Sequence, residues 1–105
     1  MPITYCDLLG EWELFSSEAP GLVQGSEIYS FSEDHVMIHE FNDVKGKTFT
    51  RFTVRPFLNG LDLLRKDGTT FVRWNLEWHG QMLRLTNSFH SFRSLIRKID
   101  RPNQT

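Results

Sequence analysis

Apolar and polar residues alternate along most of this chain, and the alternation stops at short segments rich in Gly, Asn, Asp and Ser. A period of two residues is typical of β-strands that bury one face. The segments with this pattern are 10–15, 27–32, 35–41, 48–54, 61–65, 70–78, 82–86 and 92–99. The pattern therefore predicts an all-β chain, with room for one helical turn between Ile3 and Leu9 that Thr4 would cap.

The segments between the predicted strands favour tight turns. Gly46 and the Asn59-Gly60 pair tolerate positive φ, and we expect Pro56 to end the fourth strand. Most connections are too short for parallel crossovers, so consecutive strands should pair antiparallel. Pairing the first strand with the last removes two exposed edges. We therefore predict an eight-stranded antiparallel up-and-down barrel in one domain, residues 1–105, with a lead-in over 1–8 and a polar tail over 100–105.

Aromatic residues are numerous, with nine Phe, three Trp and two Tyr. Side chains of this size bury large areas, so most of them should lie inside the barrel. Those that we place on inward faces are Tyr29, Phe31, Phe52, Trp74 and Trp78. They either fill the core or line a cavity at the open end, since eight strands enclose packed side chains or one small ligand. A cavity below roughly 100 Å³ would exclude the second alternative, because typical ligand pockets have about 300–1,000 Å³.

Charge is distributed unevenly along the chain. Residues 1–44 carry nine acidic residues and no Lys or Arg, whereas residues 45–105 carry all twelve Lys and Arg against four acidic residues. Either the two halves attract each other where they meet in the barrel, or a dipolar surface steers a charged partner. The basic residues are spread through several strands, so we do not expect nucleic acid as the partner.

The chain lacks the motifs of common catalytic and metal sites. His35, His39, His79 and His90 do not have the spacing of a zinc site, and no nucleophile elbow, phosphate loop or dinucleotide motif is present. We therefore expect no enzyme, no cofactor and no metal. Cys6 is the single cysteine, the start of the chain does not resemble a secretory signal, and no apolar run would span a membrane, so we expect a cytoplasmic protein.

The segment Leu8-Leu9-Gly10-Glu11-Trp12-Glu13-Leu14 resembles the opening of the lipocalin-like, or calycin, superfamily. In that superfamily a Gly-x-Trp motif begins the first strand, the Trp plugs the closed end of the barrel, and a basic residue of the last strand lies over it. The resemblance implies that Gly10, Trp12 and Arg97 close the barrel, with Arg93 as the second candidate for the basic residue. The chain departs from most lipocalins and fatty-acid binders in being shorter and in lacking their helices.

The barrel and the resemblance together predict a non-enzymatic binding protein for a small apolar or amphipathic ligand at the open end. Arg51, Arg73 or Arg84 would meet an anionic head group if its side chain points inward. The alternative is a protein-interaction module, such as an inhibitor or immunity-type protein, that uses the acidic N-terminal half and the loop over 16–25. Binding of nucleic acid through the basic strands is a third and weaker alternative. The identity of the ligand or partner and the oligomeric state do not follow from the sequence.

Overall fold

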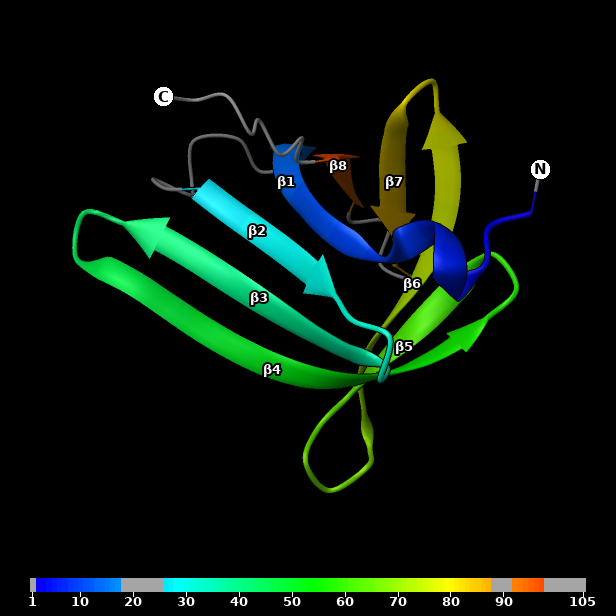
Figure 1. Cartoon of the computed structure of the whole chain (residues 1–105), viewed down its shortest axis with the longest axis horizontal. Helices are drawn as coiled ribbons and strands as arrows, with labels where there is room; N and C mark the ends of the chain where they lie inside the picture. Colours follow the sequence, from blue (N-terminus) through cyan, green and yellow to red (C-terminus); the bar gives the residue numbers. More distant parts are fainter. Residues whose placement is uncertain (1, 18–25, 88–91, 98–105) are drawn as a thin grey trace.

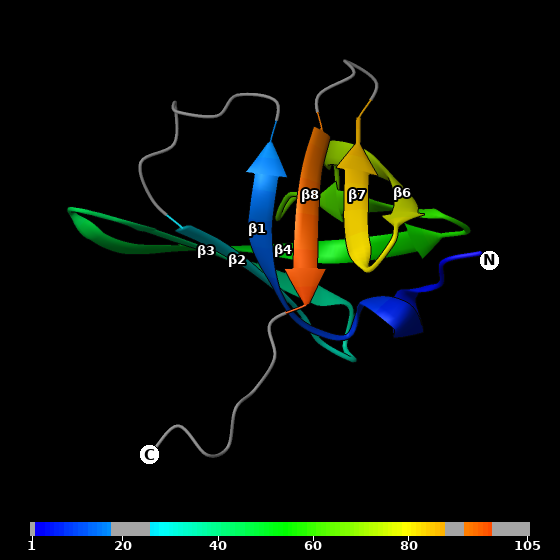
Figure 2. The ribbon, with the colours of Figure 1, turned by 90° about the horizontal axis from the view of Figure 1, so that it is seen from above.

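A computed structural model places eight strands in one closed barrel and describes residues 2–17, 26–87 and 92–97. The strands are β1 (Gly10–Ser17), β2 (Ser26–Phe31), β3 (Val36–Asp43), β4 (Gly46–Phe57), β5 (Gly60–Leu64), β6 (Thr70–His79), β7 (Met82–Thr86) and β8 (Phe92–Arg97). Each strand pairs antiparallel with the next, and β1 pairs with β8 (Figures 1 and 2). In the β1–β8 pair Trp12 lies opposite Arg97. The predicted all-β, up-and-down barrel is confirmed.

The N-terminal segment covers one end of the barrel, which we call the closed end. Its predicted helical turn is a short 3₁₀ helix, η1 (Tyr5–Leu8), which follows Thr4. The Thr4 N–H and hydroxyl donate to Asp7 Oδ2 over 2.9 and 3.2 Å. The Tyr5 ring stacks on His35 in the β2–β3 turn, with centroids 4.6 Å apart. The lead-in therefore forms part of the packed structure.

Inward-facing apolar residues of every strand fill the barrel below its open end. The buried apolar residues, which include two from the N-terminal segment, are Ile3, Leu8, Trp12, Tyr29, Phe31, Met37, Val54, Leu61, Leu63, Trp74, Leu76, Leu83, Leu85 and Leu95. Ile3 and Leu8 belong to this core, so the N-terminal segment contributes apolar burial as well as covering the closed end. Alternation along β7 agrees with the prediction, because Leu83 and Leu85 are buried on either side of the less buried Arg84.

Strand β4 is longer than predicted, because Pro56 does not end it. The strand continues to Phe57, and Pro56 pairs with Leu61 of β5. The Val54 N–H points toward β3 and donates to His35 O over 2.8 Å. The backbone nitrogen of Pro56, two residues further along, points the same way, but β3 does not extend that far. The missing N–H of Pro56 therefore removes no hydrogen bond from the sheet. At its other end the β3–β4 hairpin projects beyond the neighbouring strands (Figures 1 and 2).

The β4–β5 turn differs in detail from the prediction. Its two residues are Leu58 and Asn59, and only Asn59 of the predicted pair has a positive φ, of 61°. Gly60 is instead the first residue of β5, where a Cβ atom would lie 2.2 Å from the Phe57 ring. Glycine is therefore needed at position 60 because a side chain would not fit beside the Phe57 ring, and not because the backbone has a positive φ.

Candidate functional site

A cavity of about 290 Å³ lies at the open end of the barrel, opposite η1. The residues that line it are Tyr29, Met37, His39, Thr50, Phe52, Leu63, Phe71, Val72, Trp74 and Arg93. Its volume is well above the roughly 100 Å³ that would exclude a ligand, and close to the lower limit of typical ligand pockets. The barrel is therefore hollow toward the open end.

Aromatic side chains form much of the cavity wall. Of the aromatic residues predicted to face inward, Tyr29, Phe52 and Trp74 are brought together here. Phe71 stacks on Phe52 with ring centroids 5.1 Å apart, and its side chain is 52% exposed. These two rings therefore lie where an apolar molecule would enter the cavity.

Phe71 reaches this position because of an irregularity between β5 and β6. Leu63 pairs with Val72, but Leu64 pairs with Thr70, so Phe71 is an extra residue in the register. Such a bulge changes the direction of a side chain. Strict alternation over 70–78 would place Phe71 on the outer face beside Arg73, and the alternation does not reveal the bulge.

A polar cluster forms one wall of the cavity, around the carboxylate of Glu27. The Tyr29 hydroxyl lies 2.7 Å and His39 Nε2 lies 2.8 Å from Glu27 Oε1. Nη1 of Arg93 donates to both carboxylate oxygens over 3.1 Å. Glu27 is only 3% exposed, so four polar side chains from three strands meet inside the barrel.

The register of β2 and β3 brings this cluster together. Glu27 and Tyr29 are two residues apart and both point inward, and Tyr29 lies directly opposite His39. The Tyr29 and His39 rings stack with their centroids 4.7 Å apart. Arg93 comes from β8, which is separated from β2 by β1, and its side chain reaches Glu27 along the inner face.

The partners of Glu27 determine its charge. Burial alone would raise the pKa of its carboxyl, but hydrogen bonds from His39 and Tyr29 and the charge of Arg93 lower that pKa to about 2. Burial raises the pKa of the Tyr29 hydroxyl, and the nearby Glu27 charge adds to this increase. Glu27 is therefore an acceptor only, so the Tyr29 O–H and the His39 Nε2–H are the donors.

This cluster was not predicted as a site. From the sequence, Tyr29 is expected on an inward face, Arg93 is only a second candidate to cover Trp12, and Glu27 has no expected role. A signal was present, because Glu27 has the same parity as Tyr29 and Phe31, and so lies on the inward face of its strand. An acidic residue on an inward face needs a partner, which indicates a buried ion pair.

Two of the predicted ligand-lining residues lie away from the cavity. Phe31 is buried near the closed end, where its ring meets Tyr5 edge-on with centroids 6.3 Å apart. Trp78 is 36% exposed and lies beside Trp12, with ring centroids 6.1 Å apart. Both residues are far enough along their strands to lie below the cavity, so neither lines it, and Phe31 instead belongs to the core.

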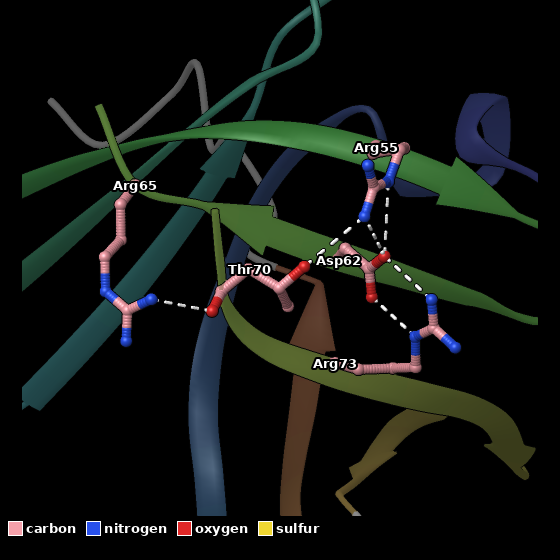
Figure 3. A network of polar contacts seen from close by, with 5 residues as sticks. All are labelled: Arg55, Asp62, Arg65, Thr70 and Arg73. Carbon is pink, nitrogen blue, oxygen red and sulfur yellow. Dashed lines mark hydrogen bonds and ion pairs between the residues drawn. The ribbon is translucent and has the colours of Figure 1, made fainter. Parts of the chain in front are cut away.

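Arg73 lies on the outer wall of the barrel, in a network with Arg55 and Asp62 (Figure 3). Its Nε and Nη2 donate to the Asp62 carboxylate over 2.7 and 3.0 Å, and Nη2 of Arg55 donates to Asp62 over 2.9 Å. The Arg73 guanidinium also lies over the Phe57 ring, 4.9 Å from its centroid. The Arg73 side chain therefore does not point into the cavity, and the condition under which it would meet a head group there is not met.

The register explains why these three side chains meet, since Asp62 is paired with Arg55 on one side and Arg73 on the other. Hydrogen bonds from Arg73 are the largest influence on the pKa of Asp62, which is lowered to about 2 against the opposing effect of burial. Asp62 is fully covered, although it is on the outer face, because the two arginine side chains lie over it.

The other arginines that were considered for a head group do not line the cavity. Arg84 lies over the Phe92 ring, 4.5 Å from its centroid, and Arg51 is exposed on β4. Arg93 is the arginine of the described residues that lines the cavity.

Gly10, Trp12 and Arg97 come together at the closed end. The Trp12 side chain is 1% exposed, and its indole N–H donates to Leu8 O over 2.8 Å. The Arg97 guanidinium lies 4.3 Å from a Trp12 ring centroid and donates to the Leu9 and Asp7 carbonyls over 2.8 and 2.9 Å. Gly10 has a φ of 111°, and a Cβ atom there would approach Arg97 to 3.1 Å. The geometry is the one that the calycin resemblance implies.

The contact between the acidic and basic halves of the chain is partly internal. The Glu27–Arg93 ion pair joins them inside the barrel, whereas the Asp62 network belongs entirely to the basic half. One acidic and one basic residue from the two halves therefore form an ion pair beside the cavity.

The part of the chain that the structure describes holds neither a metal-binding group of side chains nor a membrane-spanning helix. Within residues 2–17, 26–87 and 92–97, no group of three His, Cys, Asp or Glu side chains is arranged to hold a metal ion. No helix in these ranges is long and apolar enough to cross a membrane. His90 and Glu18 lie outside them, as does the tail over 100–105.

Comparisons with known proteins give no relative from which a role can be taken. No protein family, no curated protein and no solved structure matches the chain. The interpretation of the cavity therefore depends on its shape, its lining and its polar cluster.

Proposed function

We propose that this protein binds a small apolar or amphipathic molecule in the cavity at the open end of the barrel, and that it is not an enzyme. The observation that carries the proposal is the combination of an aromatic wall, formed by Phe52, Phe71 and Trp74, with the polar cluster around Glu27. Ligand sites commonly combine apolar walls with a few polar groups that orient the ligand. The ligand would place its apolar part against the rings and its polar head near Arg93 and His39.

We also infer that the chain is a compact member of the calycin superfamily and that it acts in the cytoplasm. The Gly10-x-Trp12 motif, the guanidinium of Arg97 over the indole and the eight-stranded meander support membership. A single cysteine, Cys6, supports a location where disulfides are not needed.

The proposed function is tested with an apolar fluorophore and a variant that fills the cavity. N-phenylnaphthylamine should bind the wild-type protein saturably, at about one molecule per chain, with an increase in its fluorescence. Val72→Phe should abolish this binding, because the larger side chain occupies the cavity. Val44→Phe makes the same change at a site that is 95% exposed and should bind like the wild type. Equal binding by both variants would contradict the proposal.

Native mass spectrometry of the protein from its source cells provides a second test. A retained small molecule that is lost in Val72→Phe would support the proposal, whereas a retained protein would support the alternative function.

That alternative is a protein-interaction module that uses the acidic N-terminal half. Phe15 on β1 favours it, because this aromatic side chain is 62% exposed on a strand that also carries Glu11 and Glu13. Exposed aromatic residues near charged ones are common in protein interfaces. A salt-sensitive pull-down of one basic protein, lost when Glu11, Glu13 and Glu18 are changed to Gln, would establish this alternative.

A further inference from the structure

The charged groups at the cavity are already paired with each other. Among the described residues that line the cavity or contact its polar wall, the groups that carry or can gain charge are Glu27, Tyr29, His39 and Arg93. The negative charge of the Glu27 carboxylate and the positive charge of the Arg93 guanidinium cancel, and the Tyr29 hydroxyl is neutral. The remaining lining residues from β3, β4, β5 and β6 are uncharged. With a neutral imidazole, the formal charge of the site is therefore zero.

Within the part of the chain that the structure describes, hydrogen-bonding capacity nevertheless remains in the cluster. Arg93 uses Nη1 for Glu27, and a guanidinium carries three further N–H groups on Nε and Nη2. His39 donates through Nε2, which makes Nδ1 an acceptor when the ring is neutral. The polar wall is thus chemically suited to a head group that accepts hydrogen bonds from a guanidinium and that can also donate one.

From this balance we propose that the cavity selects an uncharged amphipathic molecule, such as an alcohol or carbonyl compound, over a carboxylate with the same chain. The inference rests on the proposed function, and it specifies the class of ligand. A carboxylate head that reaches Arg93 would lose its water and would lie close to the Glu27 carboxylate, which already neutralises that arginine at 3.1 Å. An uncharged head group accepts hydrogen bonds from the same N–H groups of Arg93 without this repulsion. It also loses less hydration free energy than a carboxylate does.

The wall of the cavity offers no second cation in the described residues to offset such repulsion. Arg73 is held on the outer face by Asp62, and Arg84 lies over Phe92 outside the cavity. The preference therefore depends on one residue, Glu27, whose replacement by its amide would leave Arg93 without a balancing charge while keeping nearly the same shape.

The test compares octanol with octanoate by isothermal titration calorimetry at about pH 8, where an ordinary carboxyl is ionised and an ordinary imidazole is neutral. We expect the wild-type protein to bind octanol at least about tenfold more tightly than octanoate. Glu27→Gln should increase the affinity for octanoate at least about tenfold relative to the affinity for octanol. Glu77→Gln removes the same charge from an exposed position on β6 and should change neither affinity.

The outcomes separate this inference from the function on which it rests. Tighter binding of octanoate than of octanol by the wild type would overturn the inference and leave the proposed function standing. A Glu27→Gln variant with an unchanged octanoate affinity relative to that for octanol would also overturn it. Binding of neither compound, together with no binding of N-phenylnaphthylamine, would overturn the proposed function itself. If Glu27→Gln does not fold, the comparison of the two compounds on the wild type still decides the matter.

Discussion

Glu27 and Arg93 are separated by 66 positions in the chain, and their side chains meet inside the barrel with Nη1 of the arginine 3.1 Å from both carboxylate oxygens. The carboxylate is almost fully buried, whereas the guanidinium is about one-third exposed. This pair links a strand of the acidic half to the last strand of the basic half and borders the cavity. Its contribution to stability can be separated from its contribution to binding.

Removing the cation should destabilise the fold more than removing an outer arginine. Arg93→Met leaves Glu27 buried with two of its three partners, and we expect the free energy of unfolding to fall by about 1–3 kcal/mol. Arg55→Met is the matched control, since Asp62 keeps its two hydrogen bonds from Arg73. Urea denaturation measures both variants. A smaller loss for Arg93→Met than for Arg55→Met would contradict this prediction.

Acidification should weaken the fold through two carboxylates. The pKa of Glu27 and that of Asp62 are both lowered to about 2, against about 4 in unfolded chains. Because the pKa of each carboxyl is lower in the folded state, its ionised form stabilises the fold at pH values above the pKa in the unfolded chain. This stabilisation is lost as the pH falls toward 2. Chemical denaturation at several pH values should show the decrease between about pH 4.5 and 2.

The two contributions are separable by substitution. Glu27→Gln and Asp62→Asn should each reduce the slope of stability against pH in this window, and the double variant should reduce it further. An unchanged slope in the double variant would show that other carboxyl groups determine the acid sensitivity.

At the closed end, Arg97→Lys should destabilise the protein by about 1–2 kcal/mol. Lysine keeps the positive charge near the Trp12 ring but cannot donate in a fork to the Leu9 and Asp7 carbonyls. Arg51→Lys, at an exposed position, is the control and should lie within about 0.5 kcal/mol of the wild type. Equal thermal stability of the two variants would argue against a closing role for Arg97.

Gly60→Ala tests the space that the Phe57 ring occupies. The added Cβ atom would lie 2.2 Å from this ring and 2.9 Å from the Trp74 carbonyl oxygen, so we expect a loss of about 1–3 kcal/mol. Combining it with Phe57→Ala removes the contact with the ring. The cost of Gly60→Ala should therefore be smaller in the Phe57→Ala background, and additive losses in a double-mutant cycle would show that the ring does not cause the strain.

Much of the architecture was predictable because β-strands leave a local signal. Alternation in β7 and the aromatic residues of β2 locate strands without reference to distant residues. The Gly10-x-Trp12 motif likewise indicated where the barrel closes. Pro56 and Gly60 were misread, because their roles depend on where β3 ends and where the Phe57 ring lies. The place of Phe71 in the cavity wall was not predictable either, because it depends on the shift of the β5–β6 register.

The sequence by itself determined the strand order, the antiparallel meander and the inward parity of Tyr29 and Trp74, since these follow from a period of two and from short connections. Only the tertiary structure decided that the barrel is hollow at one end and that Glu27 and Arg93 neutralise each other there. Alternation assigns a side chain to a face, but not to a height within the barrel or to a partner on a distant strand. Those depend on register and closure, which are properties of the whole sheet.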